Sequence, residues 1–369
     1  MKQLTSKQCR FLMLFYVALN KIMLLPSLIC SNLTNNFWLL LIVMFGLEFL
    51  FILMILSLNK QFPDLTLKQR MQMVFGKIFT KIFYFLIGLL LLFKLVLIIH
   101  ECYIFLYDSL YSNYKWIELI IPLAIFMIYV GAKSFTNFGR CIQIIRAIIY
   151  GCIAIALFDA TSNLNLLNML PVFTTTVNRT LHTCFNYSIW FGDFILLLFA
   201  VGDVKMDKNT NKNIICGWLI GVFITFITMA FFYMTYGIIC PLRRMAIIDI
   251  TQFVPKLSNS SNFFWLVTTS WTVPICFNIG FLTFLVCQSF ENCFELKKEN
   301  HKWMSLLVSV GAMIILAIFN FRLNNMLQFL NNGFVYYVFI VQYILPLIVL
   351  PILAIQVDKK QKRRFKYVK

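Results

Sequence analysis

The chain consists largely of apolar runs that are long enough to cross a lipid bilayer. A helix needs about 20 apolar residues to do so, because hydrocarbon offers no hydrogen-bond partners to an exposed backbone. Only 12% of the 369 residues are charged, whereas a soluble domain carries about 25%. We therefore expect an all-α, polytopic membrane protein rather than a soluble enzyme. The predicted spans cover residues 11–31, 37–58, 82–107, 117–132, 141–160, 184–201, 214–239, 263–288, 304–319 and 335–356.

The distribution of positive charge predicts the orientation of these ten spans. With the N-terminus in the cytoplasm, the inner segments contain 23 of the 32 Lys and Arg residues, and the outer loops contain 6. The remaining three, Lys21, Lys94 and Arg146, lie inside predicted spans. This asymmetry follows the positive-inside rule and explains the formal net charge of +18 without a nucleic-acid partner. Both termini are therefore predicted on the cytoplasmic side.

The predicted organisation is one transmembrane domain over residues 1–358, made of two repeats at about 9–160 and 184–356, with a basic tail at 359–369. The tail is expected to anchor the last span. Attraction to anionic lipid, at about 1 kcal/mol per basic residue, is the alternative. The 11 cysteines include no CxxC pair, so neither a disulfide framework nor a metal site is predicted. The sequence has no phosphate-binding loop or hydrolase motif, and we expect no catalytic residue and no cofactor.

Two predicted spans are interrupted, and they occupy matching positions if ten spans divide as five plus five. The first carries the polar pair Asn20-Lys21 in mid-span, followed by Pro26. The sixth contains Gly192 and Asp193 within an apolar stretch. Helices broken at corresponding positions of two repeats are typical of transporter-like binding sites. The alternative is a pair of ordinary kinks whose backbone groups bond to neighbouring helices.

Ionisable side chains occur inside several predicted spans, where each costs about 3 kcal/mol at the bilayer centre and usually pairs or faces a polar cavity. We predict that Lys21 pairs with Glu48 or Asp193 across the interior. Lys94 lies seven residues before Glu101 and therefore on the same helix face. Snorkelling or structural pairing is the alternative to a role in a binding pathway. The ionisable residues in question are Lys21, Glu48, Lys94, His100, Glu101 and Asp193.

The eighth predicted span carries an amide in its apolar interior. Phe277-Asn278 follows a hydroxyl-rich stretch, and Pro274 lies between the two. An amide in hydrocarbon needs hydrogen-bond partners, which neighbouring helices can supply. Asn278 therefore either lines a polar cavity or bonds to an adjacent helix.

Several landmarks, in their order and spacing, resemble the B subunit of the GerA-type nutrient germinant receptors, the spore germination proteins of endospore-forming Firmicutes. The similarity runs from about Leu4 to Gln356. The landmarks are Leu4 to Gln8 before the first span, Met23 to Pro26 at its end, Trp38, Gln61 to Thr66, Phe75 to Lys77, Ser134 to Arg140, Asn168 to Pro171, Phe191 to Asp193, and Trp271.

The resemblance implies the five-plus-five inverted-repeat fold of the amino acid–polyamine–organocation permeases. It implies a sensor in the inner membrane of the spore that binds a small nutrient, usually an amino acid, and signals to the A and C subunits of its receptor. The ligand pocket of the family lies between spans one, three, six and eight. The matching positions here are Leu19, Asn20, Lys21, Lys94 to Ile98, Phe191, Gly192, Asp193, Phe277 and Asn278.

The sequence departs from the family pattern at two of these spans. The Gly-x-Gly break of the first span is Leu19-Asn20-Lys21 here, and the Arg-Glu pair of the third span is His100-Glu101. We expect Lys21 to contact an acidic group of the ligand, because an ammonium can stabilise a carboxylate as a point charge. Alternatively, Lys21 replaces a coupling cation, or the subunit has lost amino-acid binding.

The function expected from this resemblance is nutrient sensing within a germinant receptor. A working secondary transporter for amino acids or another small solute is the chief alternative, since it would share the fold and the pocket. A scaffold subunit with a degenerate pocket is the third. Neighbouring genes for A- and C-type subunits would favour the sensor, and uptake of labelled substrate into proteoliposomes would favour the transporter.

Overall fold

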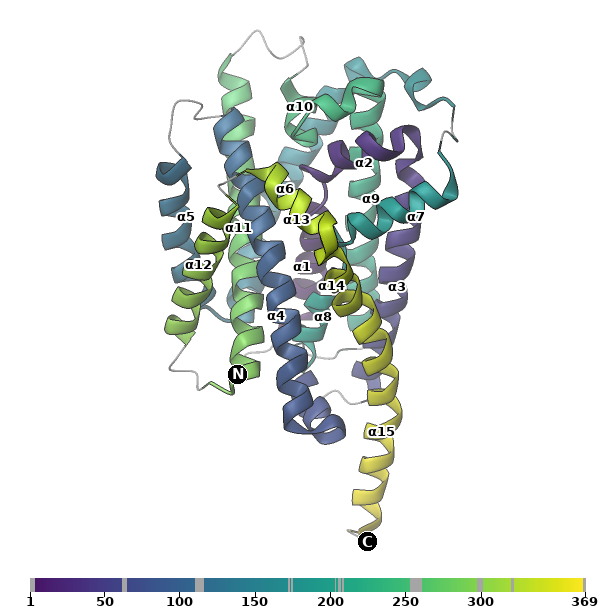
Figure 1. Cartoon of the computed structure of the whole chain (residues 1–369), viewed down its shortest axis with the longest axis vertical. Helices are drawn as coiled ribbons and strands as arrows, with labels where there is room; N and C mark the ends of the chain where they lie inside the picture. Colours follow the sequence, from purple (N-terminus) through teal and green to yellow (C-terminus); the bar gives the residue numbers. More distant parts are fainter. Residues whose placement is uncertain are drawn as a thin grey trace.

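The computed structural model of the chain describes residues 4–61, 65–109, 116–171, 173, 175–202, 204, 207, 209–252, 261–296, 301–319 and 322–367. Within these residues every regular element is a helix, and one isolated parallel bridge joins Leu4 to Val204. The helices form a bundle, seen with its long axis vertical in Figure 1. The predicted all-α, polytopic class is confirmed.

The described residues of the first half of the chain form six α-helices and three short 3₁₀ helices. These are α1 (Ser6–Leu19), α2 (Leu25–Leu33), η1 (Thr34–Asn36), α3 (Phe37–Gln61), α4 (Leu67–Ser109), α5 (Trp116–Gly131), α6 (Phe135–Ala160), η2 (Thr161–Asn163) and η3 (Leu166–Met169).

The second half is more interrupted, and its last span contains two π-helical turns. Its elements are α7 (Val177–Asn186), η4 (Ser188–Trp190), α8 (Ile195–Ala200), α9 (Thr210–Tyr236), η5 (Gly237–Leu242), α10 (Ala246–Gln252), α11 (Ser261–Phe294), α12 (His301–Ile318), α13 (Leu323–Phe329), η7 (Leu330–Phe334), α14 (Val335–Phe339), η8 (Ile340–Ile344) and α15 (Leu345–Tyr367).

Seven of the described helical segments are long and apolar enough to cross a membrane, and the bent pair of α7 with η4–α8 makes an eighth if it counts as one span. Two predicted spans fall outside this set. The short helix α5 has 16 residues, and the first predicted span is divided into α1 with 14 residues and α2 with 9. The chain is an integral membrane protein, and a total of ten crossings requires α5 and the divided first helix to be counted.

Helix α1 lies in the middle of the bundle, where α4 and α14 partly cover it in Figure 1. Residues 12–19 are all buried, and α1 packs against α6, α9 and α11. On α9, a Cβ at Gly217 would lie 2.3 Å from the carbonyl oxygen of Arg10, and one at Gly221 would lie 2.8 Å from that of Leu14. Small residues four apart let membrane helices approach closely. This contact holds the first half of the chain against the second.

Segments predicted on the cytoplasmic side meet at one end of the bundle. The amide of Asn213, at the start of α9, donates to Ser6 Oγ over 3.1 Å, and Lys81 on α4 approaches Glu295, just after α11, to 3.5 Å. Helix α15 extends beyond this end in Figure 1, whereas α2 and α10 lie at the other. The predicted basic tail therefore continues the last helix. Residues 368–369 and the tail's side chains lie outside the described part.

Candidate functional site

The sixth predicted span is divided by a short extended segment. Helix α7 ends at Asn186, η4 ends at Trp190 and α8 begins at Ile195, with a bend of 59°. Gly192 lies in this segment with φ of 82°, a conformation that glycine adopts without the steric cost of a side chain. A Cβ at Gly192 would also lie 2.3 Å from Cδ of Gln342. The break therefore needs glycine both for its backbone conformation and for space.

The first predicted span is divided by residues 20–24, which connect α1 to α2. Pro26 lies in the first turn of α2, where the backbone N–H has no intrahelical acceptor and its absence costs little. The proline thus restarts the helix, and the interruption itself falls at Asn20-Lys21. Both predicted interruptions are present in the structure, and they face each other.

Lys21 and Asp193 join the two interruptions through a buried ion pair. The ammonium of Lys21 donates to Asp193 Oδ2 and, over 3.2 Å, to the carbonyl oxygen of Val17. It also lies 5.1 Å from the ring centre of Phe191 and 5.4 Å from that of Phe45, within the range of cation–π attraction. Of the two predicted partners of Lys21, the structure pairs it with Asp193.

Lys94 brings α4 to the same carboxylate. Its ammonium lies 3.3 Å from Asp193 Oδ1 and donates to the carbonyl oxygen of Phe191 over 3.0 Å. Its charge also lies 5.3 Å from the ring centre of Tyr16 on α1. Asp193 therefore accepts from two ammonium groups, one from the break in the first span and one from α4.

Glu48, on α3, is the second carboxylate of the site. Its Oε1 accepts from the backbone N–H groups of Gly192 at 2.6 Å and Asp193 at 3.2 Å. Its Oε2 accepts from Trp218 Nε1 of α9 at 3.3 Å. The chain's own carboxylate thus occupies the backbone donors that the break in the sixth span exposes.

Two asparagines complete the network. Asn20 Nδ2 lies 3.3 Å from Asp193 Oδ1, and Asn278 Nδ2 on α11 donates to Asn20 Oδ1 over 2.8 Å. Asn278 therefore bonds to a neighbouring broken helix at the edge of the site. We refer below to the following seven residues as the central cluster: Asn20, Lys21, Glu48, Lys94, Asp193, Trp218 and Asn278.

The central cluster contains two ammonium groups and two carboxylates, so its formal charges balance. Lys21, Glu48 and Asp193 are fully buried, and Lys94 is 4% exposed. Buried ions are tolerated only when they are paired, and removing one partner costs about 3–5 kcal/mol. The described part of the chain contains no group of three or more His, Cys, Asp or Glu side chains placed to hold a metal ion.

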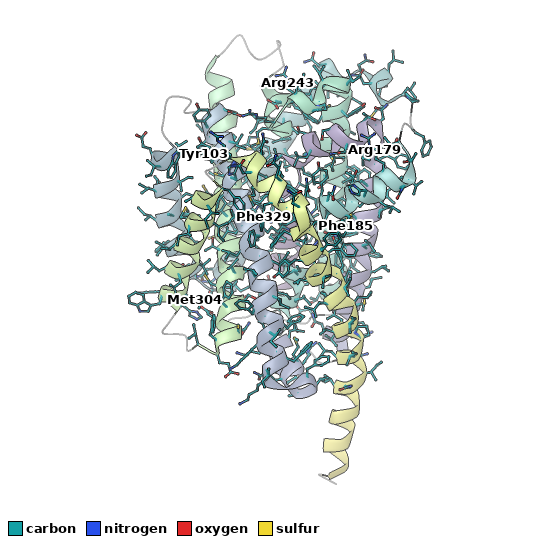
Figure 2. All side chains as sticks on the ribbon, viewed as in Figure 1. Tyr103, Arg179, Phe185, Arg243, Met304 and Phe329 are labelled. Carbon is teal, nitrogen blue, oxygen red and sulfur yellow. The ribbon has the colours of Figure 1, made fainter. Side chains whose placement is uncertain are left out.

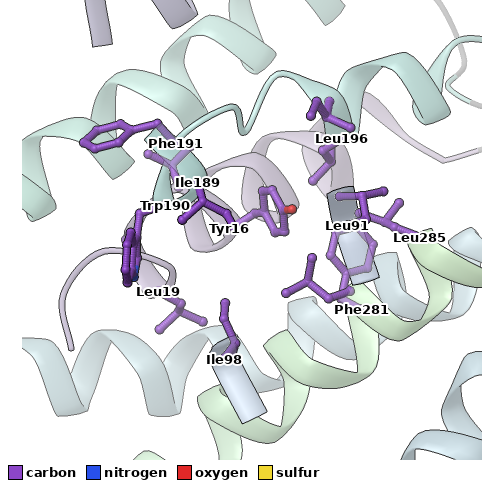
Figure 3. Packing of buried hydrophobic residues seen from close by; sticks show 14 of the residues in the cluster. Tyr16, Leu19, Leu91, Ile98, Ile189, Trp190, Phe191, Leu196, Phe281 and Leu285 are labelled. Atoms are coloured by element: carbon purple, nitrogen blue, oxygen red, sulfur yellow. The ribbon is translucent and has the colours of Figure 1, made fainter. Parts of the chain in front are cut away.

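Three predicted site residues form apolar surroundings. Leu19, Ile98 and Phe277 are each buried, and Figure 3 shows Leu19 and Ile98 next to one another beside Trp190. The ring of Phe277 lies 6.0 Å from that of Phe138 on α6. These side chains provide apolar packing around the central cluster and form no hydrogen bond through their side chains.

The remaining intramembrane charges on α4 lie one to two turns from Lys94. Glu101 Oε1 accepts from Trp190 Nε1 of η4 over 2.9 Å, so it supports the break from the other side. His100 is 2% exposed, and its ring lies 6.1 Å from that of Tyr103. His100 belongs to a separate cavity that is described below.

Sequence reasoning missed three residues that position the breaks. They are Trp218, which holds Glu48, Trp190, which holds Glu101, and Gln342, whose Nε2 donates to the carbonyl oxygen of Ser188 over 2.8 Å. Gln342 lies in the π-helical turn η8 and is 1% exposed. Its signal in the sequence is a single amide inside the apolar run of the last span.

Comparison with known proteins identifies a family for nearly the whole chain. The family model described as "Spore germination protein" matches residues 3–326. No curated protein matches the chain. The matched segment includes every residue of the central cluster.

Proposed function

Because the chain belongs to the spore germination protein family, we propose that it is the nutrient-sensing subunit of a germinant receptor. In this proposal it lies in the inner membrane of the spore, with both termini on the core side, and it binds a small germinant, in the simplest case an amino acid, at the central cluster. The A- and C-type subunits of the receptor are its proposed partners.

The balanced charge of the central cluster is the observation that supports this proposal. An amino-acid zwitterion carries one carboxylate and one ammonium, the same two groups that the cluster already pairs. Such a ligand can enter without changing the net charge of a buried site, which a singly charged solute cannot do. The carboxylate of the ligand would pair with Lys21 or Lys94, and its ammonium would pair with Asp193 or Glu48.

Glu48 is the group that a ligand carboxylate would replace first. It holds the N–H groups of Gly192 and Asp193, donors that a ligand carboxylate can also use. A ligand that displaces Glu48, or that competes for Lys21, loosens the tie between the two broken helices. Binding then favours a different arrangement of those helices, as a ligand does when it prefers one of two states.

Gln342 offers a route by which this rearrangement reaches the rest of the receptor. It connects η8 in the last span to the carbonyl oxygen of Ser188, three residues before the break at Phe191. A shift of the break would move this contact, and α15 continues from η8 to the end of the bundle where the tail lies. Partner subunits that contact this helix could sense the change.

The experiment uses spores whose receptor carries Lys21→Met. We expect the nutrient response, followed as dipicolinate release, to be lost in spores whose receptor is still assembled and detected on immunoblots. Lys77→Met is the matched control, because Lys77 is exposed on α4 and lies 17 residues before Lys94 along that helix. A normal response from assembled Lys21→Met receptors would end the proposal. Uptake of labelled amino acid into proteoliposomes would show a transporter instead.

A further inference from the structure

A cavity separate from the central cluster lies between α4, α2, α13 and the segment that leads into α10. Its volume is about 660 Å³, within the range of about 300–1,000 Å³ that is usual for small-molecule sites. None of the four charged residues of the central cluster lines it. Its lining includes Leu24, at the end of the break in the first span, so the cavity reaches the edge of that break. We call this cavity the vestibule.

Exposure changes along the vestibule from one end to the other. His100 is 2% exposed, whereas the side chain of Arg244 is 71% exposed and that of Asp108 is 37% exposed. His100 therefore marks the inner end, and Arg244 marks the mouth. Arg322, at the start of α13, is exposed and also lines the cavity. In Figure 2, Tyr103 marks this region of α4.

The imidazole of His100 is a buried polar group that faces the vestibule. Among the described residues, none forms a hydrogen bond or ion pair with it, and its ring packs beside that of Tyr103. Buried polar groups are usually hydrogen-bonded, and each exception calls for an explanation. The nitrogens of His100 are thus open to a partner within the vestibule.

The charges of the vestibule select the class of ligand. Arg244 approaches Asp108 to 3.9 Å, which leaves the guanidinium of Arg322 as the cation without a carboxylate partner among the described residues. A guanidinium presents paired N–H donors that match a carboxylate. The lining thus combines one available cation with a buried imidazole and several amide side chains.

We propose that the vestibule is a second small-molecule site, which holds a carboxylate-bearing solute between Arg322 at its mouth and His100 at its inner end. The ligand class follows from these side chains alone. A role as the entrance to the central cluster rests on the function proposed above, because it requires the solute to continue past Leu24 to the broken helices.

Charge-selective labelling tests the site without knowledge of the natural ligand. The full chain with His100→Cys is purified and treated with a methanethiosulfonate that carries a sulfonate, or with its trimethylammonium counterpart. Label at position 100 is quantified by peptide mass spectrometry, and each rate is divided by the rate of the same reagent with free 2-mercaptoethanol. We expect the anionic reagent to be favoured about tenfold, the size of effect that a charged cleft produces.

Two further variants assign the effect to the vestibule. Arg322→Gln should remove most of the preference, whereas Arg179→Gln on α7, a matched exposed arginine outside the vestibule, should leave it unchanged. Propionate should protect the cysteine, and ethylamine should not. If His100→Cys does not fold, Tyr103→Cys replaces it.

Equal rates for the two reagents, no effect of Arg322→Gln, or no protection by propionate would overturn the proposal. The result does not depend on germination. A vestibule that behaves as expected in a chain whose Lys21→Met variant germinates normally would retain the second site and reject the function proposed for the central cluster.

Discussion

Lys21 and Asp193 form a fully buried ion pair although 172 residues separate them in the sequence. Each lies at the interruption of a different helix, so one contact joins the two places where the membrane spans are broken. Lys94 binds the other oxygen of the same carboxylate at 3.3 Å. The relative position of the two broken helices is therefore set by charge pairing rather than by apolar packing alone.

The first prediction concerns the energy of this pair. Asp193→Leu should destabilise the protein by about 3–5 kcal/mol, because it leaves the buried ammonium groups of Lys21 and Lys94 without their carboxylate. Lys21→Met should cost less, because Asp193 keeps Lys94 as a partner. The double variant should recover part of the loss seen in Asp193→Leu, since Lys21 no longer lacks a partner but Lys94 still does. The charge swap Lys21→Asp with Asp193→Lys should also recover part of it. Thermal unfolding of the purified protein in detergent measures all four, and additive losses in the double variants would show that the pair is not coupled.

The second prediction separates the two roles of Glu48. Glu48→Gln should cost about 1–3 kcal/mol, because its amide cannot accept from both the break and Trp218, and a buried donor is left unsatisfied. Trp218→Phe removes one donor and keeps the aromatic ring, so it should cost about 1 kcal/mol. Unfolding temperatures of the two variants provide the comparison. An equal loss would mean that the N–H groups of Gly192 and Asp193 do not depend on Glu48.

The third prediction concerns the backbone at Gly192. Gly192→Ala should prevent stable folding or strongly reduce the yield of folded protein, because φ is 82° and the added Cβ would contact Gln342. Gly151→Ala is the control, since a Cβ there meets nothing within 4 Å; it should be neutral or stabilise α6 by about 0.5–1 kcal/mol. Size-exclusion profiles and unfolding temperatures test both. Normal folding of Gly192→Ala contradicts the assigned backbone requirement.

The fourth prediction concerns Gln342 and the output of the sensor. Gln342→Leu removes one of the two donors to the buried carbonyl of Ser188, which keeps the backbone N–H of Phe191, and should cost about 0.5–1.5 kcal/mol. If Gln342 transmits the change, spores with this variant should still bind nutrient but release dipicolinate more slowly. Gln143→Leu, on the exposed surface of α6, is the control. A normal release rate together with the expected loss of stability would make Gln342 purely structural.

The two breaks and their ion pair could be predicted from the sequence because hydrocarbon disfavours the residues that mark them. Asn20-Lys21, and Gly192 with Asp193, interrupt otherwise apolar runs, and a charge in such a run must find a partner. The choice between Glu48 and Asp193 could not be predicted. It depends on the hydrogen bonds that Glu48 accepts from the backbone N–H groups of Gly192 and Asp193. These N–H groups become available only once the sixth span is broken in the folded protein.

The parts that escaped prediction involve residues whose type is ordinary in a membrane helix. Trp218 resembles any other membrane tryptophan until α9 is placed beside α3. Gln342 lies beside the break within the π-helical turn Ile340–Ile344. No pattern in the sequence predicted that turn. The vestibule was missed for a similar reason, since its lining comes from four separate segments, although His100 itself was recognised as an intramembrane polar residue.

Ligand binding to a variant that lacks the central ion pair tests the account most directly. The purified full chain in lipid nanodiscs is mixed with each proteinogenic amino acid in turn, and its unfolding temperature is measured. At least one amino acid should stabilise the native chain, by about 2.7 kcal/mol at a concentration 100 times its Kd. The folded double variant Lys21→Met with Asp193→Leu should lose that stabilisation. Equal stabilisation of the double variant would contradict the assignment of the nutrient site to the two broken helices.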